Sequence, residues 1–229
     1  MMGVLGKLSA ALVAAFALYN LWIFSHILYW RDHNPAASAF MTAQLAKLQE
    51  DDPNAELRHK WVPYDRISPN LKRALIAAED ARFVDHVGFD WDGMEAAFEK
   101  NLKKGRIVAG GSTISQQLAK NLFLSEQRTP WRKMEEALVT VMLEAVMDKR
   151  RIFEIYLNVI EWGNGVFGAE AASRHYFHIS AARLNAAQAA KLAAMVPNPR
   201  YYDAHRNATG LGHKTRIIQR RMPYADLPD

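Results

Sequence analysis

The 229-residue sequence contains no cysteine. Disulfides, thiolate zinc sites and cysteine nucleophiles are therefore excluded, while an oxidising compartment stays compatible with the sequence. Segments that alternate apolar and polar residues, as strands do, are scarce, and there is no internal repeat. Apolar residues recur at helical spacing instead, so we expect one mainly α-helical domain with a hydrophobic core.

Charged residues are absent from Ser9–Trp30, a run of 22 positions. Its length matches the roughly 20 apolar residues that a membrane-spanning helix needs. Lys7 and the amino terminus mark the near side as cytoplasmic. We therefore expect a cytoplasmic segment over 1–8, a transmembrane anchor over 9–30 and the remaining chain outside the cytoplasm.

A cleaved signal peptide is the alternative, because Ala37-Ser38-Ala39 resembles a processing site. The apolar region of a signal peptide spans only about 7 to 15 residues, and this one is longer. A retained anchor is therefore the favoured interpretation. Both interpretations place the rest of the chain outside the cytoplasm.

Cap residues, prolines and glycine breaks predict the helices of the remaining chain. We expect a juxtamembrane segment over 31–65, with a short helix over Phe40–Glu50, and a single domain over 66–222. Further helices are expected from Ser68-Pro69 into Glu79, over Trp91–Lys104, from Ser112 as N-cap to Leu122, from Thr129-Pro130 onwards, over Ile152–Trp162, over Ala181–Met195 and over Gly210–Arg221.

Several features have an ordinary structural interpretation. Trp131, Met134 and Met142 share one helical face, which we assign to the core. His175 and His178 are assigned to the surface, and Arg216, Arg220 and Arg221 to a solvated helix face. The net charge of +5 suits nucleic acid, a membrane surface or a phosphorylated substrate, so the charge does not choose among them.

A carboxylate pair, Glu79-Asp80, ends an apolar helix and is followed by an aromatic residue and a histidine. Apolar surroundings raise the pKa of a carboxylate, which then accepts a proton near neutral pH. The pair is therefore a candidate for a catalytic base. The alternative is two surface acids paired with Arg82.

A glycine pair, Gly110-Gly111, leads into the next predicted helix. Free N–H groups at such a helix N-terminus suit an anion. One helical face then carries the polar residues Thr113, Gln117, Lys120 and Asn121. The spacing of a Walker loop is absent, so an NTP site is not expected. The alternative is a capped helix with a solvated polar face.

A third polar segment places Arg132 four residues and Lys133 three residues before Glu136. These pairs are explained either as surface ion pairs, each contributing only a few tenths of a kcal/mol, or as a basic cradle for phosphate. Spacing alone leaves both interpretations open.

Five blocks follow one another along the chain. They are Glu79-Asp80-x-x-Phe83-x-x-His86-x-Gly88, Gly110-Gly111-Ser112-Thr113-Ile114-Ser115-Gln116-Gln117-x-x-Lys120-Asn121, Arg132-Lys133-x-x-Glu136, Lys149-x-Arg151-Ile152-x-Glu154-x-Tyr156-Leu157-Asn158, and Leu192-Ala193-Ala194 with Pro197-x-Pro199. In this order they resemble the peptidoglycan glycosyltransferase (transglycosylase) family. Its members are monofunctional enzymes and the amino-terminal modules of bifunctional penicillin-binding proteins. The resemblance covers about Glu79 to Tyr202.

The resemblance implies a lysozyme-like, two-lobed, mostly helical fold and a substrate, lipid II, which is a disaccharide-pentapeptide carried on undecaprenyl pyrophosphate. Glu79 matches the general base that takes the proton from the acceptor 4-hydroxyl, which displaces the lipid pyrophosphate with inversion. Glu136 matches the second catalytic carboxylate, on the donor side, although the neighbouring Glu135 blurs that match.

The resemblance also implies a set of substrate-binding residues. Four of them match the cations that hold pyrophosphate: Lys120, Arg128, Arg132 and Lys133. The others are Asp80, Phe83, His86, Ser112, Thr113, Gln117, Asn121 and Lys149. No obligatory cofactor or metal ligand is implied, and a divalent cation, magnesium or manganese, is left open as an aid to the pyrophosphate.

The expected partners are lipid II, the growing glycan strand, membrane lipid and other cell-wall synthesis and division proteins, without nucleic acid. The expected location is the bacterial inner membrane, crossed once, with the catalytic domain in the periplasm. Ser-x-x-Lys and Lys-Thr-Gly are absent, so transpeptidase chemistry is not expected. A lytic glycosidase and a catalytically inactive scaffold are the rival functions. Four cations argue against the first, since a glycosidase has no phosphate at its scissile bond.

Overall fold

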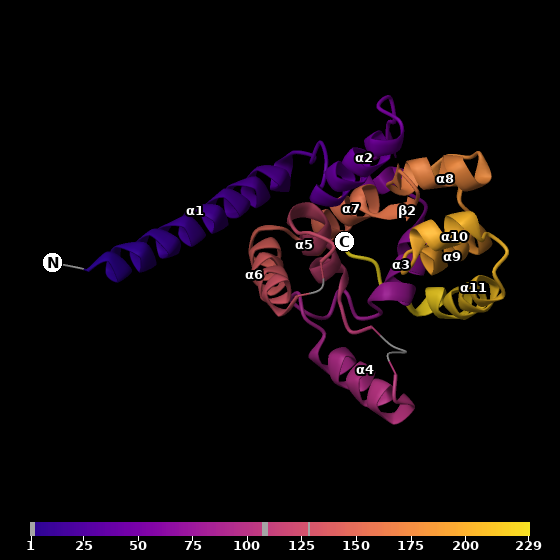
Figure 1. Ribbon diagram of the computed structural model, residues 1–229. Coiled ribbons are helices and arrows are strands. Elements are labelled where there is room, and N and C mark those ends of the chain that lie inside the picture. The colour runs from indigo at the N-terminus through magenta and orange to yellow at the C-terminus, as the bar shows by residue number, and fades with distance from the viewer. Residues whose placement is uncertain (1–2, 107–109, 128) are drawn as a thin grey trace.

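The computed structural model describes residues 3–106, 110–127 and 129–229 (Figure 1). It is mainly α-helical, as the sequence predicts. The helices are α1 (Val4–Asp32), α2 (Ala39–Asp51), α3 (Pro69–Glu79), α4 (Trp91–Lys104), α5 (Ile114–Phe123), α6 (Pro130–Val146), α7 (Lys149–Val159), α8 (Ala169–Phe177), α9 (Ala186–Met195), α10 (Pro199–Ala204) and α11 (Thr209–Arg221). Short 3₁₀ turns cover Tyr64–Arg66, Ala181–Arg183 and Met222–Tyr224.

Helix α1 projects from the body of the protein (Figure 1). It is long and apolar enough to cross a membrane. Its carboxyl-terminal half contacts the body, where Ile23 and Ile27 are buried, whereas most of its other side chains are exposed. The helix therefore has one end packed on the protein and one end free of it.

The core is built around α7, in which seven of eleven residues are buried. Phe153 of this helix packs with Phe83 and with Tyr156, and all three side chains are fully buried. Helix α5 packs against both α6 and α7, while α3 packs against α9 and α11. The two groups of helices meet where Gln117 of α5 bonds Glu79 at the end of α3, and the candidate functional site lies at this contact.

A small sheet extends this core with the strand order β1-β3-β2. Strand β1 (Arg58–His59) pairs in parallel with β3 (Val166–Phe167), which pairs in antiparallel with β2 (Glu161–Gly163). Residues 31–65 thus contribute both β1 and α2, and α2 packs against α5. The juxtamembrane segment is part of the folded body.

Three of the differences between predicted and observed helix boundaries have a clear structural reason. The N-cap of α5 is Thr113, not Ser112, because the Thr113 hydroxyl accepts the Gln116 N–H in a capping box. The helix predicted to reach Trp162 ends at Val159, since the following residues pair as β2. The helix predicted from Ala181 begins at Ala186, after a separate 3₁₀ turn.

The assignment of the α6 stripe to the core is wrong for two of its three residues. Trp131 and Met134 are 63% and 65% exposed, and only Met142 packs against the core. Leu138 and Val141 extend this exposed apolar face along α6. Because α1 contacts α6, the exposed stripe lies next to the long apolar helix α1.

Candidate active site

Glu79 is the last residue of α3, at the end of an apolar helix as predicted. It is half-buried, and Gln117 Nε2 donates a hydrogen bond of 2.8 Å to its Oε2. Burial raises the pKa of Glu79, and the Gln117 bond and the charges of Lys214 and Lys120 oppose this rise. Among the described residues no side chain bonds the second carboxylate oxygen, Oε1, which is available to a substrate proton.

Gln117 is held in one orientation by Tyr156. The Tyr156 hydroxyl donates to Gln117 Oε1 at 3.0 Å, which turns the amide nitrogen towards Glu79. Tyr156 is fully buried and its pKa is raised well above the usual value by burial, so it stays a proton donor. A chain of hydrogen bonds from the core therefore orients the candidate base.

Asp80, by contrast, faces inward and ties α3 to α5. Its Oδ2 accepts the backbone N–H of Ile114 at 2.9 Å, and its Oδ1 lies 3.0 Å from His86 Nε2. A carboxylate at a helix N-terminus is favourable because the free N–H groups there carry partial positive charge. Asp80 and His86 thus position the start of α5 beside Glu79.

The cationic cluster predicted at the start of α6 is present. Arg132 Nη1 bonds Glu136 Oε2 at 2.6 Å, and Lys133 Nζ bonds Glu136 Oε1. Glu136 itself is 3% exposed, so these are not ordinary surface pairs. Lys133 also reaches Ser112 Oγ at 3.3 Å, which joins the glycine segment to the cluster.

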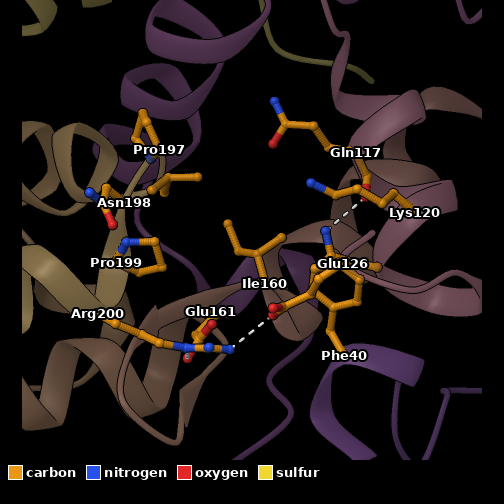
Figure 2. Close-up of a pocket in the computed structure, with 12 residues that line it drawn as sticks. Phe40, Gln117, Lys120, Glu126, Ile160, Glu161, Pro197, Asn198, Pro199 and Arg200 are labelled. Atoms are coloured by element: carbon orange, nitrogen blue, oxygen red, sulfur yellow. Dashed lines mark hydrogen bonds and ion pairs between the residues drawn. The ribbon is translucent and has the colours of Figure 1, made fainter. Parts of the chain in front are cut away.

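Lys120 connects this cluster with the Glu79 region. Burial lowers the pKa of Lys120, and Glu136 opposes this shift. Lys120 shares one cavity of about 260 Å³ with Arg132 and a second of the same volume with Gln117. In Figure 2, Gln117 and Lys120 lie on one side of the second cavity, and Pro197–Arg200 face them from the other.

The cavity of Figure 2 is closed at its lower edge by an ion pair. Arg200 reaches Glu126 at 3.0 Å and also binds Glu161 at 2.8 Å. The loop after α5 is thereby attached to α10. Neither Arg200 nor Glu126 is among the residues predicted for the site.

Comparison with known proteins decides the family. A family model for transglycosylases matches residues 42–223. This chain belongs to the transglycosylase family. It is 80% identical over 225 residues to the biosynthetic peptidoglycan transglycosylase of Chromobacterium violaceum, covering 98% of this chain and 99% of the relative. It is also 71% identical over 219 residues to the protein of that name from Laribacter hongkongensis, covering 96% of each chain.

Several residues that the family resemblance assigns to substrate binding lie beneath the site. Phe83 is fully buried, and the Lys149 ammonium lies 4.6 Å from the centre of its ring. Lys149 also binds Glu144 at 2.7 Å. Asn121 is buried and donates to the backbone oxygen of Gln117. In this structure the three side chains contact other protein groups beneath the transglycosylase site.

Of the remaining predicted residues, Thr113 has a structural role, Arg128 is not described, and Arg82 has a different partner from the one predicted. Thr113 is buried and donates to the Gly88 carbonyl oxygen at 2.6 Å, so it has a structural partner. Arg128 lies outside the described residues. Arg82, offered as a partner for the carboxylate pair, instead binds Asp92 at 2.6 Å. The explanation of Glu79 as a surface acid paired with Arg82 is therefore wrong.

Sequence reasoning missed Tyr156, Lys214 and Arg221 as site residues of this transglycosylase. Tyr156 belongs to the fourth motif block, but its contact with Gln117 spans 39 positions. Lys214 and Arg221 line a cavity together with Glu79, although the sequence assigned Arg221 to a solvated face. No local pattern connects a basic tail helix with a carboxylate so far away in the chain.

Proposed function

We propose that this chain polymerises lipid II into linear glycan strands by inverting β-1,4 glycosyl transfer, with Glu79 as the general base. The relatives named above are called biosynthetic peptidoglycan transglycosylases, which supports the reaction class. The observation that carries the proposal is the placement of a partly buried, hydrogen-bonded carboxylate near a group of cations.

In the proposed reaction, one bond forms and one bond breaks at the anomeric carbon of the donor, and Glu79 receives the released proton. The acceptor 4-hydroxyl oxygen forms a bond to the anomeric carbon of the donor while Glu79 takes its proton. The bond from that carbon to the lipid pyrophosphate breaks, and the electron pair leaves with the pyrophosphate. Positive charge stabilises the negative charge that develops there, and Lys120, Arg132 and Lys133 are the described candidates for this role.

A glycosidase needs an acid for the leaving oxygen and a second carboxylate that serves the anomeric carbon or a water molecule. Glu136 is poorly suited to either role, because both of its oxygens are bonded to cations. The geometry therefore favours transfer from a pyrophosphate over glycan hydrolysis.

A divalent cation stays a prediction. Two described acids lie beside Lys120 and Arg132: Glu136, whose oxygens Arg132 and Lys133 already occupy, and Glu126, which binds Arg200. Magnesium prefers an octahedral set of oxygen ligands, which these cationic side chains do not supply. We therefore assign no step of the reaction to a metal ion.

One apolar helix near the N-terminus is consistent with a single membrane anchor. We propose that α1 spans the bacterial inner membrane and that the catalytic domain faces the periplasm, where lipid-linked substrates are reached at the membrane surface. The exposed apolar face of α6 next to α1 supports a position of the domain at the membrane surface. Recruitment by other cell-wall synthesis or division proteins remains a prediction.

The test of this function is polymerisation of purified lipid II by the full chain in detergent. We expect glycan polymer and released undecaprenyl pyrophosphate from the wild type. Release of short fragments from preformed peptidoglycan, without any polymer from lipid II, would support the glycosidase and overturn the proposal. Cell growth restored equally by the wild type and Glu79→Gln would support the inactive scaffold.

A further inference from the structure

A third cavity, of about 380 Å³, opens beside Glu79 between α3, α9 and α11. Small and apolar side chains form most of its wall: Ala77, Ala78, Ala193, Ala194, Ile217 and Ile218. It contains none of the cations Lys120, Arg132 and Lys133. Its volume and mixed lining are those of a small-molecule site, in which a few polar groups orient a ligand over an apolar surface.

Two cations from α11, Lys214 and Arg221, face this cavity. They are seven residues apart, which places them on the same side of the helix two turns from each other. Within 3–106, 110–127 and 129–229, neither forms an ion pair. Lys214 contacts Tyr202, donating to its hydroxyl at 3.3 Å and lying 5.4 Å from the centre of its ring. Two uncompensated charges in one cavity attract an anion.

The position of Lys214 links the cavity to the reaction. Its charge lowers the pKa of Glu79, against the larger effect of burial, so the ammonium lies close enough to act on the carboxylate. A molecule bound by Lys214 is therefore next to the reacting atoms. The other basic residues of this helix, Arg216 and Arg220, do not line the cavity.

We propose that this cavity is a saccharide subsite in which Lys214 and Arg221 bind a carboxylate on the peptide stem of the substrate. The inference rests on the proposed function, which supplies a sugar chain with peptide stems. The apolar wall suits the face of a sugar ring, and the two cations suit the free carboxylate of a peptide.

A carboxylate fits this position better than a second pyrophosphate does. Each pyrophosphate of the substrates is attached to a lipid and stays at the membrane. Helix α1, the only described candidate for a membrane span, lies at the other side of the molecule from α11 (Figure 1). Peptide stems have no such attachment and extend away from the membrane.

The experiment combines variants of the full chain with two substrates. Lipid II is compared with lipid II whose peptide carboxylates are converted to amides, at the pH plateau of each variant. We expect Lys214→Met to lower kcat/KM for lipid II about tenfold, the usual size of a lost charge-assisted hydrogen bond. With the amidated substrate, wild type and Lys214→Met should differ less than twofold, since the carboxylate contact is already gone. Arg221→Met should behave in the same way.

Two further variants complete the design. Lys214→Arg keeps the charge and should retain most of the activity on lipid II, whereas Arg220→Met removes a cation of the same helix outside the cavity and should match the wild type with both substrates. An equal loss for Lys214→Met with both substrates, or no loss with either, overturns the subsite. Absence of polymer from the wild type with unmodified lipid II would instead contradict the proposed function.

Discussion

At the residue scale, Glu79 is placed where catalysis and stability have opposite requirements. Burial raises the pKa of its carboxyl group in the folded state. The folded state therefore binds this proton more tightly than the unfolded chain does, and its stability falls as pH rises from the unfolded pKa through the folded one. An ionised Glu79 is nevertheless what a general base requires.

Replacing Glu79 by glutamine should separate these two effects. We expect Glu79→Gln to lose about 10²- to 10⁴-fold in polymerisation rate, because the base is gone. Its free energy of unfolding at neutral pH should equal or exceed that of the wild type, and the advantage should vanish below the unfolded pKa of glutamate. Rate assays and thermal unfolding at several pH values test both parts. An inactive variant that is less stable at pH 7 would contradict this account.

The rate of the wild type should itself depend on pH through the same group. Because burial raises the pKa of Glu79, the acidic limb of kcat/KM should lie above the pH at which an exposed glutamate titrates. Activity should fall as the pH drops through that limb. A profile that stays flat down to the pKa of an ordinary glutamate would show that a different group is the base.

Tyr156 offers a smaller change at the same site. Its hydroxyl orients Gln117, which in turn bonds Glu79, and the ring is fully buried. We expect Tyr156→Phe to keep the core packing, to cost about 1 kcal/mol of stability for the lost hydrogen bond, and to lower kcat about tenfold. Melting temperature and kcat are the measurements. An unchanged kcat would show that Gln117 holds its orientation without Tyr156.

At the element scale, Gly88 joins the segment between α3 and α4 to the start of α5 by a hydrogen bond. Gly88 has φ of +81°, and its carbonyl oxygen accepts the Thr113 hydroxyl. A Cβ at Gly88 would lie 2.9 Å from Thr140 Cγ2. Both the backbone conformation and the approach of α6 therefore require glycine at this position.

Gly105 provides a matched control for this argument. It has φ of +60° at the end of α4, but a Cβ there would meet nothing within 4 Å. We expect Gly105→Ala to cost about 1 kcal/mol, the price of the backbone conformation alone. Gly88→Ala should cost at least about 2 kcal/mol, because the clash with Thr140 is added. Chemical denaturation measures the free energy of unfolding of both variants. Equal losses of stability would show that the Cβ at position 88 does not clash with Thr140.

Much of the element order follows from local chemistry, and its errors follow from contacts that local chemistry does not contain. Proline after a cap residue correctly predicted the starts of α3 and α6. Ser112 and Thr113 are both good cap residues. Gln116 completes a capping box with Thr113, whose hydroxyl also binds Gly88, 25 positions away. Lys214 could not be predicted beside Glu79, because only the packing of α11 on α3 brings them together.

At the scale of the whole molecule, apolar side chains alone do not distinguish a core from a lipid-facing surface. The stripe on α6 has helical spacing, yet Trp131, Met134 and Val141 are exposed. Trp131 lies 6.4 Å from Phe16 of α1, measured between ring centres. A large exposed apolar patch in a folded protein usually marks an interaction surface, and here it adjoins the exposed apolar surface of α1.

This arrangement predicts membrane binding that does not depend on the spanning helix alone. A chain without residues 1–20 keeps the buried Ile23 and Ile27 but loses the length needed to cross a bilayer. We expect it to cosediment with phospholipid vesicles through the exposed face of α6.

In that chain, Val141→Asp should lower the bound fraction at least about fivefold, since a charge at the lipid surface is costly. Tyr224→Asp, at a side chain that is 85% exposed on the 3₁₀ turn after α11, should leave binding unchanged. Equal binding by both variants would show that α6 does not face the lipid, and no binding by the truncated chain itself would show that the spanning length of α1 is required at the membrane.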